Sequence, residues 1–278
     1  MSPELEKRIA ALASNREAGA SELLAEAIAI LQAALGGGGD VRQVARAICQ
    51  AQPSMAPMWN AAHAALGGDL ERFAQRAERA PAAVARFSAE ALQVGLPPGA
   101  AVRIATISYS ATVLRVLEAL AAARPLTVAC SESRPALEGR RLAMRLAASG
   151  IPVTLFADAA IGHGLDACDA VVVGADAVAP GWFLNKSGTR MLAAAALERG
   201  VPVYVLAGRE KFVSPDVAER LAVIDAGRAE VWDEAPAGVS VRNPSFERTP
   251  LELVAGVITD VGMLGADAVS DLCAAISS

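Results

Sequence analysis

Residues 102–130 read VRIATISYSATVLRVLEALAAARPLTVAC, and this stretch contains a complete strand–helix–strand unit. Apolar and β-branched residues fill 102–107 and again 126–130, and the residues between them carry apolar side chains at helical spacing. Two strands joined by a helix predict parallel pairing with a right-handed crossover. The stretch therefore predicts an α/β fold.

Three further apolar runs, at 153–156, 170–173 and 203–206, extend the same alternation toward the C-terminus. Each run is almost continuously apolar, which is typical of parallel strands with helices on both faces. A stack of buried helices is disfavoured, because the runs are too short for helices. We expect a doubly wound, mostly parallel sheet.

Upstream of this unit, residues 3–90 show helical spacing and no strand-like run. The glycine tract 36–39 predicts the end of a helix over 21–35, and Asp40 is a plausible N-cap for a helix over 41–50. Near residue 97 the helical spacing of apolar residues gives way to short apolar runs. We therefore expect a helical N-terminal domain at 1–97 and a ligand-binding α/β domain at 98–278.

The net charge and the amino-acid composition reduce the number of function classes that need to be considered. The net charge of −5 gives no overall attraction to a nucleic-acid backbone, although a local basic patch is compatible with it. Four separated cysteines and two histidines predict free thiols and no metal site, and no cofactor is expected. No apolar run reaches the roughly 20 residues of a membrane span. We expect a cytoplasmic protein with no membrane and no direct nucleic-acid partner.

Polar residues follow every predicted strand. In chain order they are Ser108-Tyr109-Ser110, Ser131-Glu132-Ser133-Arg134, Asp158, Gly174-Ala175-Asp176 and Gly208-Arg209-Glu210-Lys211. Each taken alone is better explained as a helix cap or turn former. Ligands of open parallel sheets bind beyond the carboxyl ends of the strands, so together these residues predict a site at one edge.

The chemistry expected at this edge is phosphate binding. Arg134 and Lys186 supply cations, and the helices that begin after Ser110 and after Gly188 offer backbone N–H groups. The first strand lacks the dinucleotide motif GxGxxG, and no P-loop motif is present. His63 is interpreted as a packed helix residue, and Cys130 as a buried small side chain rather than a nucleophile.

Three motifs together resemble one superfamily. They are Ser131-Glu132-Ser133-Arg134-Pro135 with Glu138-Gly139, Gly174-Ala175-Asp176 with Asn185-Lys186-Ser187-Gly188-Thr189, and Asn243-Pro244-Ser245-Phe246-Glu247 with Thr249-Pro250. These are similar to signatures shared by the α, β and δ subunits of eukaryotic initiation factor 2B, ribose-1,5-bisphosphate isomerase and methylthioribose-1-phosphate isomerase. The resemblance implies a helical domain followed by a Rossmann-like domain, and a homodimer or larger homo-oligomer.

The resemblance also implies roles for individual residues. Asp176 corresponds to the catalytic aspartate of the isomerases, and Ser108 stands where they carry a catalytic cysteine. The segment Gln52-Pro53-Ser54 departs from the family's arginine-proline-threonine. Residues implied in ligand binding are Arg16, Gly19, Ala20, Ser110, Glu132, Arg134, Asn185 and Lys186.

Three functions remain open at this point. The first is a protein related to initiation factor 2B that binds a phosphorylated sugar or nucleotide without isomerising it, which the segment 106–119 favours by its similarity to the α subunit. The second is an active sugar-phosphate isomerase that pairs Asp176 with Ser108, Cys130 or Tyr109. The third is an assembly scaffold with a relic pocket. We also expect self-association through the α/β domain, because the apolar stretch 251–264 exceeds what one small domain covers.

Overall fold

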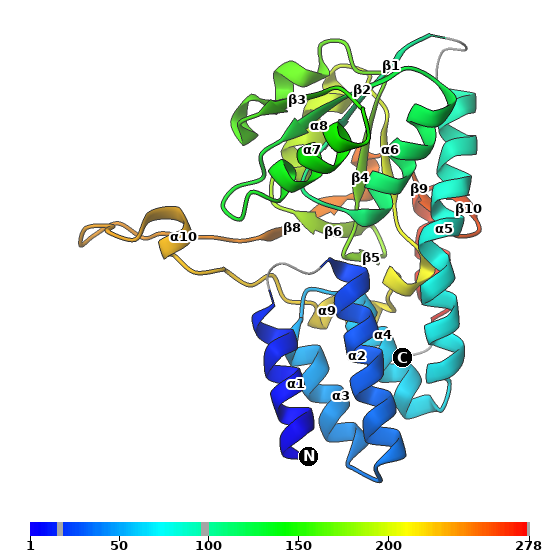
Figure 1. The fold of residues 1–278 in the computed structure, drawn as a ribbon, viewed down its shortest axis with the longest axis vertical. Coiled ribbons are helices and arrows are strands. Elements are labelled where there is room, and N and C mark those ends of the chain that lie inside the picture. Colours follow the sequence, from blue (N-terminus) through cyan, green and yellow to red (C-terminus); the bar gives the residue numbers. More distant parts are fainter. Residues whose placement is uncertain (16–18, 96–99, 277–278) are drawn as a thin grey trace.

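The computed structural model describes residues 1–15, 19–95 and 100–276. A bundle of helices forms the N-terminal part, an α/β unit lies beside it, and one long helix runs along both (Figure 1). In the described ranges no helix combines the length and the apolar character that crossing a bilayer requires.

The N-terminal part is helical, as predicted. Its elements are α1 (Pro3–Ser14), α2 (Ala20–Gly36), α3 (Val41–Ala51), α4 (Ala56–Gly67) and α5 (Leu70–Gly95). Helix α2 ends in the glycine tract, and the Asp40 carboxylate caps α3 by accepting the Gln43 N–H at 3.1 Å. Fully buried Ile30, Leu31 and Ile48 lie in the core of this bundle.

Helix α5 belongs to both parts of the molecule. Phe73 and Ala77, in its first half, pack in the core of the bundle, whereas Val84 and Leu92 pack in the core of the α/β unit. The domain boundary expected at residue 97 lies outside the described residues. Because α5 contributes to two cores, it fixes the bundle against the α/β unit.

The α/β unit is built on a seven-stranded sheet of order β10-β9-β7-β4-β1-β2-β3. Its strands are β1 (Val102–Thr106), β2 (Leu126–Ser131), β3 (Val153–Phe156), β4 (Ala170–Gly174), β7 (Val203–Leu206), β9 (Gly256–Thr259) and β10 (Gly262–Leu264). All neighbours are parallel except β10, which runs antiparallel to β9. The five predicted strands are confirmed, each to within one residue at its ends.

Helices cover both faces of this sheet. They include α6 (Ala111–Ala123), α7 (Glu138–Ala148), α8 (Thr189–Glu198) and α11 (Ala266–Ala274), with the 3-10 turn η1 (Asp158–Leu165). Successive strand residues alternate between two cores: Ile104 and Val172 pack with α5, α6 and α7, and Ala105 and Val171 pack with η1, α8 and α11. This alternation explains why the strands read as continuously apolar.

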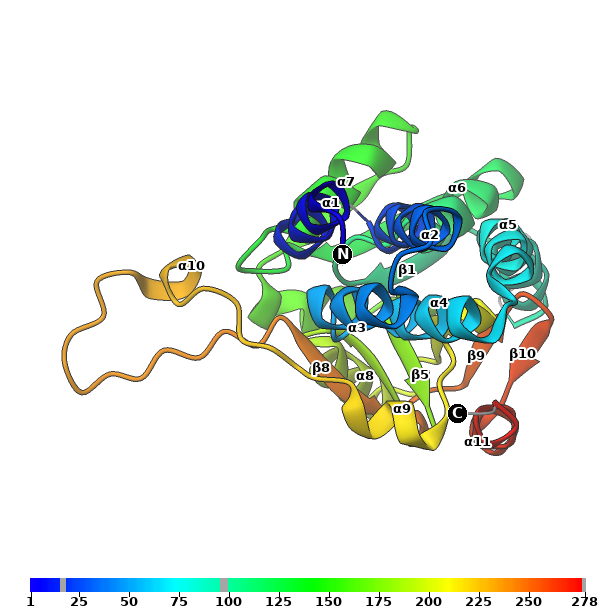
Figure 2. The same cartoon turned by 90° about the horizontal axis from the view of Figure 1, so that it is seen from below.

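A second, smaller sheet was not predicted. It contains β5 (Ala177–Ala179), β6 (Trp182–Lys186) and β8 (Phe246–Pro250), all antiparallel. The chain between β7 and β8 contains η2 (Arg209–Lys211), α9 (Pro215–Arg220) and α10 (Ala229–Trp232). The segment 222–245, which carries α10, extends away from the body as an arm (Figures 1 and 2).

The apolar stretch 251–264 is not the exposed surface that we expected. It forms η3 (Leu251–Leu253), β9 and β10, and Leu251, Val257 and Ile258 are each at most 2% exposed. Strand β9 lies between β7 and β10, so both of its edges are hydrogen-bonded within the sheet. Of the large apolar side chains in this stretch, Val261 and Met263 at the sheet edge are exposed, at 52% and 55%.

Candidate functional site

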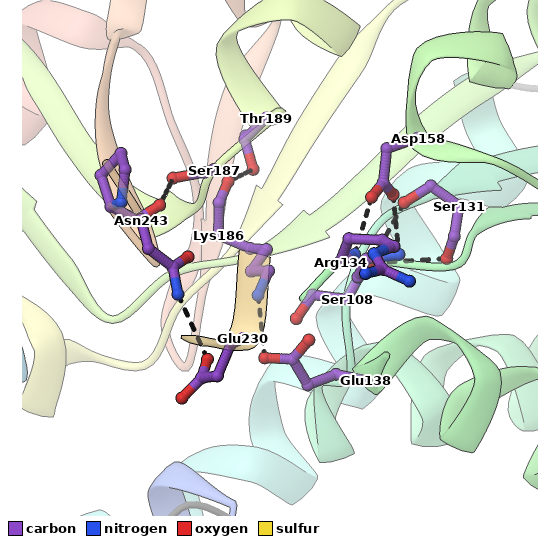
Figure 3. Close-up of polar contacts among 12 residues, drawn as sticks. Ser108, Ser131, Arg134, Glu138, Asp158, Lys186, Ser187, Thr189, Glu230 and Asn243 are labelled. Carbon is purple, nitrogen blue, oxygen red and sulfur yellow. Dashed lines mark hydrogen bonds and ion pairs between the residues drawn. The ribbon is translucent and has the colours of Figure 1, made fainter. Parts of the chain in front are cut away.

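The site begins two residues after the first strand, at Ser108. Ser108 has a φ of 66°, a left-handed conformation that non-glycine residues adopt at a cost of about 1 kcal/mol or more. Its N–H donates to the Ser133 hydroxyl at 2.8 Å, which fixes the turn. The Ser108 side chain points toward the side on which Lys186 and Glu138 lie (Figure 3). Held strain of this kind is typical of functional sites.

The loop after β2 is held by Asp158. Its two carboxylate oxygens accept the backbone N–H groups of Ser133 and Arg134, each at 2.7 Å (Figure 3). The Ser131 and Ser133 hydroxyls lie 3.1 Å apart within the same loop. Asp158 thus positions the loop, and the Arg134 side chain is left exposed to solvent.

The pair Glu138-Gly139 places a carboxylate in the site. A Cβ at position 139 would lie 1.7 Å from the Ser131 carbonyl oxygen, so only glycine lets α7 start this close to the loop. Glu138 accepts from the Lys186 ammonium at 3.0 Å through Oε1, while its Oε2 is buried and has no partner among the described residues. The Lys186 side chain is 3% exposed, which makes this a largely desolvated ion pair.

Asp176 is anchored from two directions. Its N–H donates to the Leu184 carbonyl in β6 at 2.8 Å, and its own carbonyl accepts the Ala56 N–H at the start of α4 at 3.0 Å. The bundle and the small sheet therefore meet at this residue.

Burial is the main reason that the pKa of the Asp176 carboxyl lies at about 6 rather than at 3.8. The charges of Lys211 and Lys186 lower this pKa, and Glu138 raises it. A carboxyl with such a pKa can give and take a proton near neutral pH.

Residues of the third sequence motif bind the turn between β6 and α8. The Glu247 carboxylate accepts the backbone N–H groups of Gly188 and Arg190 at 2.6 and 2.9 Å. The Ser187 N–H and hydroxyl donate to the Ser245 and Pro244 carbonyls. The prediction that the start of α8 offers free N–H groups to a phosphate is therefore wrong at these two residues: Glu247 already takes that place.

Asn185 also has an internal partner. Its side-chain amide donates to the Thr189 hydroxyl at 2.9 Å, and the Thr189 hydroxyl donates to the Lys186 carbonyl at 2.6 Å. Asn185 is 6% exposed. These bonds hold the turn that presents Lys186.

Two other candidate ligand-binding residues have structural partners. The Ser110 hydroxyl caps α6 by accepting the Val113 N–H at 3.3 Å, and Glu132 pairs with Arg140 at 2.6 Å. Cys130 is fully buried, as predicted, and burial raises the pKa of its thiol to about 12. His63 is exposed on α4, so its interpretation as a packed residue is wrong.

The candidate residues at the N-terminus are only partly described. Arg16 lies outside the described residues. The Gly19 N–H donates to Glu22 at 3.1 Å, and Ala20 lines a hollow of about 470 Å³ between α2, α5, α6 and η2. Lys211 lines the same hollow.

The hollow of about 470 Å³ differs from the site predicted at the strand edge, and that site stays a prediction. Ser108, Asp176 and Lys186 do not line this hollow. Lys211 lines it, and the charge of Lys211 lowers the pKa of the Asp176 carboxyl. The altered segment at 52–54 has structural contacts instead: the Gln52 amide donates to the Leu12 carbonyl at 2.8 Å, and the Ser54 hydroxyl donates to the Ala222 carbonyl.

Two residues of the site were not singled out from the sequence, Glu138 and Lys211. Glu138 belongs to the motif Glu138-Gly139, and Lys211 is one of the polar residues that follow the fifth predicted strand. Their charges act on Asp176 in opposite directions. The signal that could have found Glu138 was its place beside a glycine at a helix start.

Residues 5–266 match the Initiation factor 2 subunit family. The chain belongs to this family. The match spans the helical bundle, the sheet and every motif described above. It confirms the resemblance that the three motifs carry.

Two curated relatives are named as isomerases. A methylthioribose-1-phosphate isomerase of Dehalococcoides mccartyi is 34% identical over 69% of this chain and 61% of its own length. A ribose 1,5-bisphosphate isomerase of Archaeoglobus fulgidus is 38% identical over 49% of this chain and 45% of its own length. The chain thus spans less than two thirds of these relatives.

Solved structures of family members share the whole fold. A translation initiation factor eIF-2B from Pyrococcus horikoshii superposes with a TM-score of 0.79 at 25% identity, covering 95% of this chain and 98% of that one. The 5-methylthioribose 1-phosphate isomerase of the same organism gives a TM-score of 0.68 at 22% identity, covering 96% of this chain and 87% of the other. Proteins named as initiation factor 2B and as isomerase therefore share this α/β architecture.

Proposed function

We propose that this protein is a cytoplasmic family member that binds a phosphorylated sugar or nucleotide at the carboxyl ends of β1, β2 and β4, with little or no isomerase activity. The observation that carries the proposal is the desolvated Lys186 ammonium, held by Glu138 next to Asp176. A cation kept out of water at a strand edge suits a charged oxygen of a small ligand.

We propose little or no isomerase activity because of Ser108. It stands where the resemblance places a thiol, and a hydroxyl is much less acidic than a thiol. In the described structure its backbone N–H is bonded to the Ser133 hydroxyl, and neither His63 nor His163 makes a hydrogen bond with it. The thiol that would be the second proton-transfer group beside Asp176 is therefore missing.

Ligand binding should appear as a thermal shift. Ribose 1,5-bisphosphate, methylthioribose 1-phosphate or AMP at 100 times its Kd should stabilise the protein by about 2.7 kcal/mol, or raise Tm by roughly 5–10 °C. Lys186→Met should abolish the shift. Arg190→Met, which removes an exposed cation four residues further along, should keep it.

A second variant separates binding from folding. Lys186→Met alone leaves the Glu138 carboxylate without its partner and should lower stability. The double variant Glu138→Gln/Lys186→Met removes both charges and should recover part of that stability without recovering the shift. If none of the three ligands shifts Tm, or if the double variant responds as the unaltered protein does, the proposal is wrong.

An active isomerase is the second candidate. The curated relatives favour it, and so does the Asp176 pKa of about 6, which suits proton transfer at neutral pH. Turnover of either sugar phosphate by the unaltered protein, lost in Asp176→Asn, would establish this candidate over the first.

We also propose self-association through the α/β unit. Strand β10 is an edge strand, and Val261 and Met263 beside it are 52% and 55% exposed. Edge strands with exposed apolar side chains favour pairing with another chain. Light scattering at micromolar concentration should give twice the mass of one chain, and Met263→Glu should lower it. Leu66→Glu, equally exposed on the bundle, should not; a monomeric unaltered protein would contradict the proposal.

A further inference from the structure

A basic groove lies on the side of α5 that faces η2 and the C-terminal helix. It consists of two adjoining hollows of about 360 Å³ each, and both are lined by Arg72, Arg76 and Arg209. Arg79 lines the second hollow. Arg72, Arg76 and Arg79 lie outside the candidate site described above, and Arg209 follows β7.

The charge of this groove is opposite to that of the protein. Its four arginines lie near Asp69 in the first hollow and Asp260 in the second, and the charge of Arg76 also acts on the buried carboxyl of Glu210, whereas the whole chain has a net charge of −5. Arg209 already binds both Asp260 oxygens, at 2.9 to 3.2 Å. Among the described residues, Arg72 and Arg79 make no ion pair.

The spacing of three of these arginines is unusual for a helix face that only meets solvent. Arg72, Arg76 and Arg79 stand at i, i+4 and i+7 on α5, so they form one row. Such helix faces are commonly stabilised by opposite charges at i+3 and i+4, and like charges at these spacings are destabilising. Neither Arg76 nor Arg79 has a carboxylate three or four residues away on either side.

The length of the row restricts the ligand. At a rise of about 1.5 Å per residue, the backbone positions of Arg72 and Arg79 are separated by about 10 Å along the helix. To meet on one phosphate group, the Arg72 and Arg79 side chains would have to bend toward each other and bring two like charges together, whereas a chain of two or three linked phosphates can contact all three guanidinium groups along the row. Guanidinium groups bind phosphate oxygens in a bidentate manner, so each arginine can take one phosphate.

The first hollow adds an apolar wall at one end of the row. Phe73, Phe212, Leu272 and Ile276 line it, with the Arg76 guanidinium 5.7 Å from the centre of the Phe73 ring. Phe73 and Phe212 are buried, so this wall is fixed by the protein core. A ring attached to a phosphate chain would find an apolar surface there.

We propose that this groove is a second binding site, separate from the strand-edge site, for a ligand that carries a linear polyphosphate. Arg72, Arg76 and Arg79 bind the phosphates, and the apolar wall receives whatever group the chain carries. The ligand can be an inorganic polyphosphate or a nucleoside triphosphate, since both share this chemistry.

Titration calorimetry at about 50 mM salt tests the proposal, with inorganic tripolyphosphate and ATP as probes. Both should bind, and inorganic phosphate should bind much more weakly. Arg76→Gln/Arg79→Gln should weaken the binding of tripolyphosphate by about tenfold for each arginine removed. Arg86→Gln, an exposed arginine of the same helix outside the groove, should leave it unchanged.

The controls separate this site from the proposed function. Lys186→Met should bind tripolyphosphate as the unaltered protein does, so failure at one site does not decide the other. The substituted arginines are exposed and should not affect folding, which the unfolding midpoint checks. Absence of tripolyphosphate binding, binding that survives the double substitution, or preference for a single-stranded RNA oligonucleotide over tripolyphosphate would each overturn the proposal.

Discussion

Replacing Ser108 by cysteine should raise isomerisation of ribose 1,5-bisphosphate or methylthioribose 1-phosphate by about 10²- to 10⁴-fold over the unaltered protein. That range is what one positioned general acid or base contributes. The backbone cost of the left-handed φ at this position is already present with serine, and cysteine has a side chain of the same shape. The substitution therefore changes the acidity of the group more than its placement.

The measurement is conversion of aldose to ketose, followed by NMR. Ser108→Ala should behave as the unaltered protein does, and Ser108→Cys/Asp176→Asn should be inactive because the second proton-transfer group is lost. If Ser108→Cys gains no activity while the thermal shift with ligand is intact, the missing thiol is not what limits the chemistry. The altered segment at Gln52, whose amide binds Leu12, would then be the next position to examine.

The parallel part of the sheet could be predicted from sequence because its physical cause is local. A strand covered on both faces needs consecutive apolar residues, and the runs at 126–130 and 203–206 show this directly. Strand β6 is different, because it contains the polar pair Asn185-Lys186 and pairs with β8, some 60 residues later. No local pattern encodes that pairing.

The same distinction applies to the site. Asp176 and Lys186 could be expected near each other, because both stand in motifs at one edge of the sheet. The contact of Glu138 with Lys186 could not, since it depends on how closely α7 approaches the Ser131 carbonyl. For His63, the alanine-rich sequence of α4 gave no clear polar face, so helical spacing did not indicate which side meets solvent.

Asp176→Asn should make the protein more stable at pH 7.5 and leave its stability at pH 4 nearly unchanged. The pKa of this carboxyl is about 6 in the folded protein, whereas an unfolded chain gives the ordinary value of 3.8. Between these values the folded state binds more protons than the unfolded state. The free energy of unfolding therefore falls as pH rises from about 4 to about 6, and the loss is complete above pH 6.

The size of the effect follows from the two pKa values. Each pKa unit corresponds to about 1.4 kcal/mol, and partial exposure of Asp176 reduces the full difference to about 1–3 kcal/mol. Asparagine has a similar shape and does not ionise, so it avoids the cost of burying a charge. Glu210, whose pKa is also raised by burial, should leave a residual pH dependence in both proteins.

Urea unfolding at pH 4 and pH 7.5 measures the effect. The stability difference between Asp176→Asn and the unaltered protein should appear mainly at the higher pH, and Asp271→Asn, which changes an exposed carboxylate on α11, should show no such difference. Equal destabilisation by Asp176→Asn at both pH values would mean that the carboxylate is held by favourable contacts instead. A gain at pH 7.5 would mean that the protein keeps a destabilising carboxyl next to Lys186, and a residue retained against stability is expected where a ligand or a proton must be bound.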